Sequence, residues 1–223
     1  MNRKYTRKLS LLMAAVLITS SLFLSTTAVN VASVNDLGKS STYAREAIQW
    51  LANNNVISGD KQGNFNPVKT ISRPELVTLL VKALEIDTSN LPTKATFTDV
   101  PTNHWAYKYV EAANRAGVVS GTGNGKFGVN NQSTREQITA MLMNYLLVSK
   151  EAVLADLGLG ELEKFKDESK MSDWAKPSIQ FAVYNKLMSG ISSDMFSPNG
   201  SATKEQIAVI LYNKMLMHLR NLL

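Results

Sequence analysis

Three copies of one cassette of about thirty residues constrain this chain more than any other feature. In the middle copy an aromatic residue precedes a Gly-Val-Val-Ser-Gly stretch, a phenylalanine and a Thr-Arg-Glu-Gln run: Trp105, 117–121, Phe127 and 134–137. The equivalent positions lie 62 residues earlier and 69 residues later. They are Tyr43, 56–59, Phe65 and 72–75 in the first copy, and Trp174, 187–190, Phe196 and 203–206 in the third. This fixed spacing predicts one supersecondary unit used three times.

Each cassette contains two stretches with apolar residues at helical spacing. The first covers 43–52, 105–113 and 174–183 in the three copies. The second begins after a Ser or Thr, and its apolar stripe is Leu76, Leu80 and Leu84, then Ile138, Leu142 and Leu146, then Ile207, Leu211 and Met215. The period is 3.6 rather than 2, and no copy needs a sheet. The chain is therefore predicted to be all-α.

Several recurring positions predict how the helices begin and end. Ser72, Thr134 and Thr203 each precede a Glu or Gln by three residues, which is the capping-box pattern. The first helices are expected to end before Ser-Gly, where the glycine can adopt a positive φ. The three phenylalanines are expected in the core. An aspartate precedes each aromatic residue by six or seven positions and is expected to cap a helix: Asp36, Asp99 and Asp167.

The first 28 residues have the features of a secretory signal peptide. Four basic residues and no acidic ones precede an apolar run from Leu9 to Leu24, and Ala28 suits the cleavage position. The alternative is an uncleaved signal anchor, although the run is short for a span of about 20 residues. Cleavage leaves 20 Lys and Arg against 18 Asp and Glu, a net charge of about +2, so the basic pI does not indicate nucleic-acid binding. The chain has no cysteine, so no disulfide supports the exported fold.

A basic residue lies just inside the start of each second helix: Arg73, Arg135 and Lys204. Backbone N–H groups are unpaired at a helix N-terminus, and arginine adds a planar donor fork suited to a carboxylate. The Ser-Gly corners could present further backbone donors, and the sequence predicts an anion pocket that includes Ser58, Gly59, Ser120, Gly121, Ser189 and Gly190. The alternative for each basic residue is a solvated side chain or the partner of a nearby acid.

The aromatic residues Trp105, Trp174 and Tyr43 have two interpretations. They are partly buried wedges, or they offer an aromatic face to a sugar. No catalytic set of Ser, His and Asp or of Cys and His is present, and two isolated histidines do not make a metal site. We therefore expect a non-enzymatic protein with no cofactor and no metal.

The chain resembles the S-layer homology (SLH) family. The resemblance rests on 97–100 leading to 104–106, on 117–121, and on three variants of the family's Thr-Arg-Ala-Glu signature, at 72–75, 134–137 and 203–206. It implies three helix-loop-helix modules in a pseudo-threefold, three-pronged assembly around a central three-helix bundle. We expect a signal peptide over 1–28, a leader over 29–33, module 1 over 34–86, module 2 over 97–149, a linker over 150–164 and module 3 over 165–218.

The resemblance also implies a function. Modules of this family bind secondary cell wall polysaccharide, often pyruvylated and attached to peptidoglycan, in grooves between modules. The expected location is secreted and in the cell wall or S-layer, with no nucleic acid and, after signal cleavage, no membrane as partner. Other S-layer proteins are the alternative partner, in a module that serves assembly or protein interaction; a wall hydrolase is the weakest alternative because no catalytic carboxylate stands out.

The sequence departs from the family pattern in places. Tyr43 replaces the tryptophan in module 1, and Lys204 replaces the arginine in module 3. Lysine supplies the charge but not the bidentate geometry of arginine, so the groove of module 3 is expected to differ from the others. No cargo domain of the kind usual in the family is recognisable after module 3.

Overall fold

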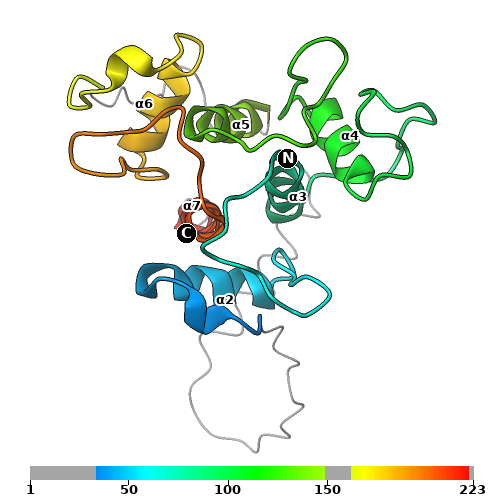
Figure 1. Cartoon of the computed structure of the whole chain (residues 1–223), viewed down its shortest axis with the longest axis horizontal. Helices are drawn as coiled ribbons and strands as arrows, with labels where there is room; N and C mark the ends of the chain where they lie inside the picture. The colour runs from blue at the N-terminus through cyan, green and yellow to red at the C-terminus, as the bar shows by residue number, and fades with distance from the viewer. Residues whose placement is uncertain (1–33, 149–161, 221–223) are drawn as a thin grey trace, which may run out of the picture. The chain divides into compact units, whose positions relative to one another are not determined.

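The computed structural model describes residues 34–148 and 162–220 (Figure 1). The predicted signal peptide, the leader over 29–33 and most of the linker over 150–164 lie outside the described residues. The described part contains no β-strand, and its α-helices are α2 (Arg45–Asn53), α3 (Arg73–Ala83), α4 (Tyr107–Arg115), α5 (Arg135–Val148), α6 (Lys176–Tyr184) and α7 (Lys204–Arg220). The all-α prediction is confirmed. Short 3-10 turns precede two of the first helices, at Leu37–Lys39 and Thr42–Ala44 before α2 and at Glu168–Lys170 before α6.

The two helices of one module do not form the main helix pairs of the fold. Instead, the first helix of a module packs against the second helix of the preceding module, as α4 packs on α3 and α6 packs on α5 (Figure 1). The series closes because α2, the first helix of module 1, packs on α7, the last helix of module 3. Tyr212 of α7 donates a hydrogen bond to Glu46 of α2 at 2.6 Å, and its ring lies 5.7 Å from that of Trp50.

A ring of backbone hydrogen bonds joins the three modules where the second helices begin. The amide of Arg73 donates to the carbonyl of Asn131 in module 2, and the amide of Arg135 donates to Gly200 in module 3, both at 2.9 Å. The amide of Lys204 donates back to Lys69 in module 1, also at 2.9 Å. The three acceptors occupy the same position of the repeat, so the bonds pass once around the molecule.

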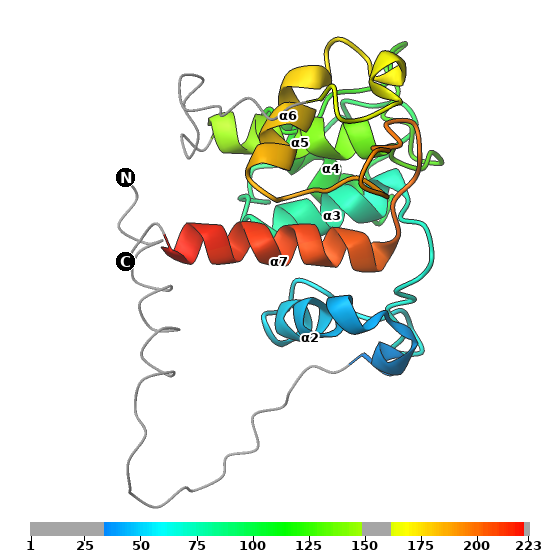
Figure 2. The same ribbon diagram turned by 90° about the vertical axis from the view of Figure 1, so that its left-hand side faces the viewer.

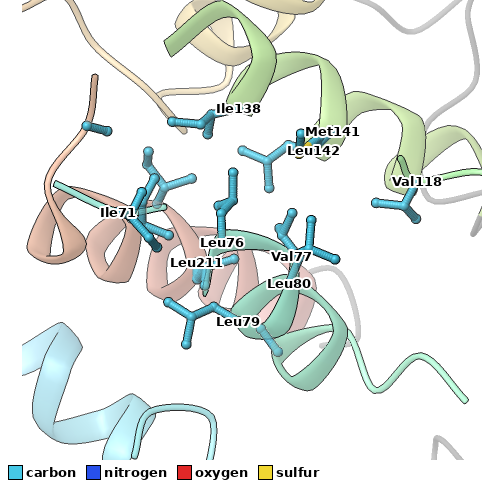
Figure 3. Packing of buried hydrophobic residues seen from close by; sticks show 14 of the residues in the cluster. Ile71, Leu76, Val77, Leu79, Leu80, Val118, Ile138, Met141, Leu142 and Leu211 are labelled. Atoms are coloured by element: carbon cyan, nitrogen blue, oxygen red, sulfur yellow. The ribbon is translucent and has the colours of Figure 1, made fainter. Parts of the chain in front are cut away.

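The second helices share one hydrophobic core. Leu76 and Leu80 of α3, Leu142 of α5 and Leu211 of α7 are all at most 3% exposed and belong to one cluster (Figure 3). Of these helices, α3 and α7 lie side by side in both ribbon views (Figure 2). This arrangement is compatible with the three-helix centre that the family resemblance implies. The predicted core phenylalanines are confirmed, with Phe65 at 4% and Phe127 and Phe196 at 0% exposure.

The capping boxes are present in all three modules. The Ser72 amide and the Glu75 carboxylate are 2.9 Å apart, and Gln137 and Gln206 bind the amides of Thr134 and Thr203 in the same way. These reciprocal bonds satisfy amides at the helix starts that would otherwise lack partners.

The prediction that the aspartates cap helices is wrong. Asp99 accepts hydrogen bonds from the amides of Phe127, Gly128 and Val129 at 2.7 to 3.0 Å. Asp36 and Asp167 bind the amides around Phe65 and Phe196 in the same manner. Each carboxylate therefore holds the segment that carries the buried phenylalanine, about 29 residues further along the chain.

The expected positive φ at the Ser-Gly glycines is also wrong. The left-handed residue that ends each first helix lies four positions earlier, at Asn55 (φ 59°), Gly117 (φ 71°) and Lys186 (φ 56°). Gly121 is required for a different reason, because a Cβ there would lie 2.5 Å from the carbonyl oxygen of Lys126. The loop folds back too closely to leave room for a side chain.

Candidate functional site

Arg73 and Arg135 are buried and bound to the loop of the following module. Arg73 is 5% exposed; its Nε donates to the carbonyl of Phe127 at 2.9 Å and its Nη2 to that of Ser120 at 2.8 Å. Arg135 is 4% exposed and binds the carbonyls of Phe196 and Ser189 at 2.9 and 2.5 Å. Each guanidinium also lies over the phenylalanine ring, 4.8 and 4.9 Å from its centre. We call these places the Arg73 junction and the Arg135 junction.

The backbone groups at these junctions do not match the predicted anion pocket. The first amide of each second helix is already bound in the intermodule ring. The next amide donates to Pro198 in α5 and to Pro67 in α7, and in α3 the next residue is Pro74, which has no amide N–H. The predicted unpaired amides at these helix starts are therefore wrong. The serines of the Ser-Gly corners present carbonyl acceptors to arginine, rather than donors to a ligand.

The charge of each buried arginine remains without a carboxylate partner in direct contact among residues 34–148 and 162–220. Burial lowers the pKa of Arg73, and the charge of Asp99 opposes that shift. Burial lowers the pKa of Arg135 likewise, against the charge of Asp167. Arginine stays protonated in either case. Both junctions therefore hold a fixed positive charge whose Nη1 group takes no part in the bonds described above.

Lys204 occupies the equivalent position at the third junction but makes different contacts. Its Nζ forms an ion pair with Oε1 of Glu75 at 2.6 Å, and the two side chains are 13% and 34% exposed. The Nζ also lies 6.0 Å from the centre of the Phe65 ring. Glu75 is the capping-box acid of α3, whereas the other two modules have Gln137 and Gln206 at that position. At the Lys204 junction the predicted cation is therefore already neutralised.

A pocket of about 110 Å³ lies at the Lys204 junction. Its wall includes three of the predicted site residues, one from each module: Ser58, Trp105 and Lys204. Glu75, Thr78, Leu79 and Lys82 of α3 line it as well. A second pocket of about 340 Å³ shares Ser58 and Lys82 with the first and also includes Gly59. The two pockets thus adjoin along α3.

The aromatic residues are exposed rather than buried. Tyr43, Trp105 and Trp174 are 59%, 56% and 59% exposed, so the interpretation as partly buried wedges is wrong. Ser172, just before Trp174, donates through its amide and hydroxyl to Glu136. The carboxylate of Glu205 accepts from Ser41 and from the hydroxyl of Tyr43.

Module 1 has Pro74 at the position of Glu136 and Glu205, so the equivalent contact between modules 1 and 2 does not form within the described residues. There the imidazole Nδ1 of His104 accepts from the Ala106 amide instead.

Sequence reasoning missed three structural features of these junctions. It did not identify Glu136 and Glu205 as intermodule anchors, Glu75 as the partner of Lys204, or Lys82 as a pocket residue. A signal was available, because aligning the copies at offsets of 62 and 69 places Glu75 and Lys82 against Gln and Asn in the other modules. The contact partners themselves depend on which module follows which in space.

Other kinds of site have no support in the part of the chain that the structure describes. No group of three or more His, Cys, Asp and Glu side chains there could hold a metal ion. None of its helices has both the length and the apolar composition of a membrane span.

Comparison with known proteins gives a consistent family assignment. The S-layer homology domain model matches residues 35–76, 96–139 and 164–208, which overlap the three predicted modules. The Surface-layer 125 kDa protein of Lysinibacillus sphaericus is 34% identical over 184 residues, covering 81% of this chain and 15% of that protein. An endoglucanase of Bacillus sp. (strain KSM-635) is 30% identical over 78% of this chain and 18% of its own length, and S-layer protein sap of Bacillus anthracis is 28% identical over 73% and 19%. The chain thus spans less than a fifth of these relatives.

Proposed function

Because the chain belongs to the S-layer homology domain family, we propose that it anchors protein non-covalently to the bacterial cell wall. The proposed ligand is an acidic secondary wall polysaccharide, in particular one with pyruvylated sugars, bound where modules meet. The proposed role is binding rather than catalysis, and the proposed location is outside the cell, in the wall or S-layer. The names of the relatives, surface-layer proteins and an endoglucanase, suit a module that holds different proteins at one place.

One observation carries the proposal. Ser58, Trp105 and Lys204, predicted as site residues from three different modules, line a single pocket. An exposed indole beside polar groups is suited to a sugar ring, whose apolar face packs on an aromatic surface while its hydroxyls remain hydrogen-bonded. The pocket therefore has the mixed character expected of a carbohydrate site.

The two arginine junctions supply the charge that an acidic sugar requires. Arg73 and Arg135 are fixed by carbonyl contacts, so their position is set before a ligand arrives. A carboxylate near such a preorganised cation is attracted without ordering a flexible side chain. A polymer that engages more than one junction gains avidity even when each site is weak.

The first test is binding of the mature chain, residues 29–223, to purified cell walls before and after extraction of the secondary polysaccharide. We expect binding to intact walls and loss of binding after extraction. Unchanged binding to extracted walls would remove the polysaccharide from the proposal. Size-exclusion chromatography with and without the polymer tests the alternative partner, because association of the chain with itself or with another S-layer protein does not need the glycan.

A second test uses exposed aromatic residues, whose replacement leaves the core intact. Trp105→Ala and Trp174→Ala should each weaken binding of a pyruvylated disaccharide by about 1 kcal/mol, or roughly fivefold. Tyr184→Ala is the matched control, because Tyr184 is 61% exposed and does not line the pocket. Equal losses in all three variants would show that the tryptophans act through general surface effects.

A further inference from the structure

We propose that Lys82, rather than Lys204, receives the acidic group of a ligand in the pocket at the Lys204 junction. This inference rests on the proposed function, since it assigns the carboxylate-binding residue of one of the proposed sites. It makes the three junctions different in construction. Two of them have the cation at the start of a second helix, at Arg73 and Arg135, whereas the third has it near the C-terminal end of α3.

Lys204 is not available for this task. Its ammonium group is 2.6 Å from a Glu75 oxygen, and Glu75 is in turn held by the amide and hydroxyl of Ser72 at 2.9 and 2.6 Å. A ligand carboxylate brought to Lys204 would approach this fixed negative charge and be repelled by it. Displacing Glu75 would also break the capping box of α3.

Lys82 is well placed for this role. It lies seven residues after Glu75 on the same face of α3, about 10 Å further along the axis. Glu75, Thr78 and Lys82 all line the smaller pocket, and Lys82 also lines the larger one. Within the described residues, Lys82 forms no ion pair with an acid. Its ammonium group is therefore the uncompensated cation of the joint pocket.

The larger pocket has space for a ligand. Its volume of about 340 Å³ lies within the range of small-molecule sites, roughly 300–1,000 Å³. Its wall is otherwise apolar or neutral, with Val34, Ala52 and Ile57 beside Asn55 and Ser58. Among residues 34–148 and 162–220, Lys82 is thus the one charged residue that lines this pocket, which favours an acidic group over a neutral sugar at this position.

The repeat itself supports the assignment. The positions equivalent to Glu75 and Lys82 are Gln137 and Asn144 in module 2, and Gln206 and Asn213 in module 3. The acid and the additional lysine therefore occur together in module 1, and both are replaced by neutral amides in the other modules. Counted over these positions and the basic residue at the helix start, each junction has a charge of +1, because Lys82 replaces the charge that Glu75 removes from Lys204.

The experiment follows the tryptophan indole N–H signals of the ¹⁵N-labelled mature chain during titration with a pyruvylated disaccharide. Trp105 lines the pocket at the Lys204 junction, whereas Trp50 packs on Tyr212 and serves as a reference signal. We expect the Trp105 signal to shift in the wild-type protein. In the variant Lys82→Asn, which introduces the residue found in the other modules, the half-saturation concentration of the Trp105 shift should rise at least about tenfold. The response of the Trp174 signal should be the same as in the wild-type protein.

The compensating double variant Glu75→Gln/Lys82→Asn gives module 1 the pattern of the other two modules. It frees Lys204, so binding followed at Trp105 should recover to within about threefold of wild type. If the Trp105 signal of Lys82→Asn titrates at the same ligand concentration as in the wild-type protein, the inference is overturned while the proposed function stays intact. A wild-type protein in which neither Trp105 nor Trp174 responds would overturn the proposed function and the inference with it.

Discussion

Replacing Arg73 by alanine should destabilise the folded protein far more than replacing Arg115, although both side chains donate to backbone carbonyls. Arg73 is 5% exposed, and its loss leaves the carbonyls of Phe127 and Ser120 without their donor. A buried carbonyl left unpaired costs about 1–3 kcal/mol, and the lost contact with the Phe127 ring adds about 1 kcal/mol. We therefore expect a loss of about 2–4 kcal/mol in the free energy of unfolding.

The control variant is Arg115→Ala, which removes an arginine that also donates to backbone carbonyls but is exposed. Arg115 donates to the carbonyls of Asp87, Ser89 and Asn90, but this contact is exposed, so water can replace it. Arg115→Ala should cost less than about 1 kcal/mol.

Urea and thermal unfolding of the mature chain, followed by circular dichroism, measure both variants. For a protein of this size 1 kcal/mol shifts the Tm by roughly 2–4 °C, so Arg73→Ala should lower it by about 4–16 °C. A shift for Arg73→Ala no larger than that for Arg115→Ala would refute the structural role assigned to the buried arginine.

Three further predictions concern other parts of the fold. Burial alone would raise the pKa of Asp99, but hydrogen bonds from the amides of Val129, Phe127 and Gly128 outweigh it, and the pKa lies below its ordinary value. Its stabilising effect is thus present above about pH 4 and lost as the pH falls through the folded pKa, so Asp99→Asn should flatten the fall in Tm below pH 4. Phe196→Ala, at a fully buried position, should cost about 3–5 kcal/mol in urea unfolding, and a cost below 1 kcal/mol would contradict its core role. Lys186 has φ 56° where module 2 has Gly117, so Lys186→Gly should raise stability by up to about 1 kcal/mol in the same assay, and a clear loss would contradict the strain argument.

The helices and their caps could be predicted from local sequence because they depend on nearby residues. The 3.6-residue period located the stripe that begins with Leu76, and a three-residue spacing located the capping box of Ser72 and Glu75. The buried phenylalanines followed from their recurrence among polar neighbours. Each of these features involves a single turn or a single helix, where spacing in the sequence fixes spacing in space.

The contacts between modules could not be predicted in this way. Periodicity shows that α2 has an apolar face, but not that its partner is α7, more than 150 residues away. Asp99 is a residue type that often caps helices, and only the fold shows that it accepts a hydrogen bond from the Phe127 amide instead. The positions of Arg73 and Arg135 suggest exposed ligand-binding residues. In the structure both side chains are buried and donate hydrogen bonds to carbonyls of the following module. The ligand-binding role of the predicted site residues remains a prediction.

The pocket lined by Ser58, Trp105 and Lys204 draws one wall from each repeat. Deleting any single repeat would therefore remove part of the lining of this pocket, and the proposed binding site would be lost altogether instead of being reduced by one third. We therefore expect the three repeats to be transferred between proteins together, as one unit.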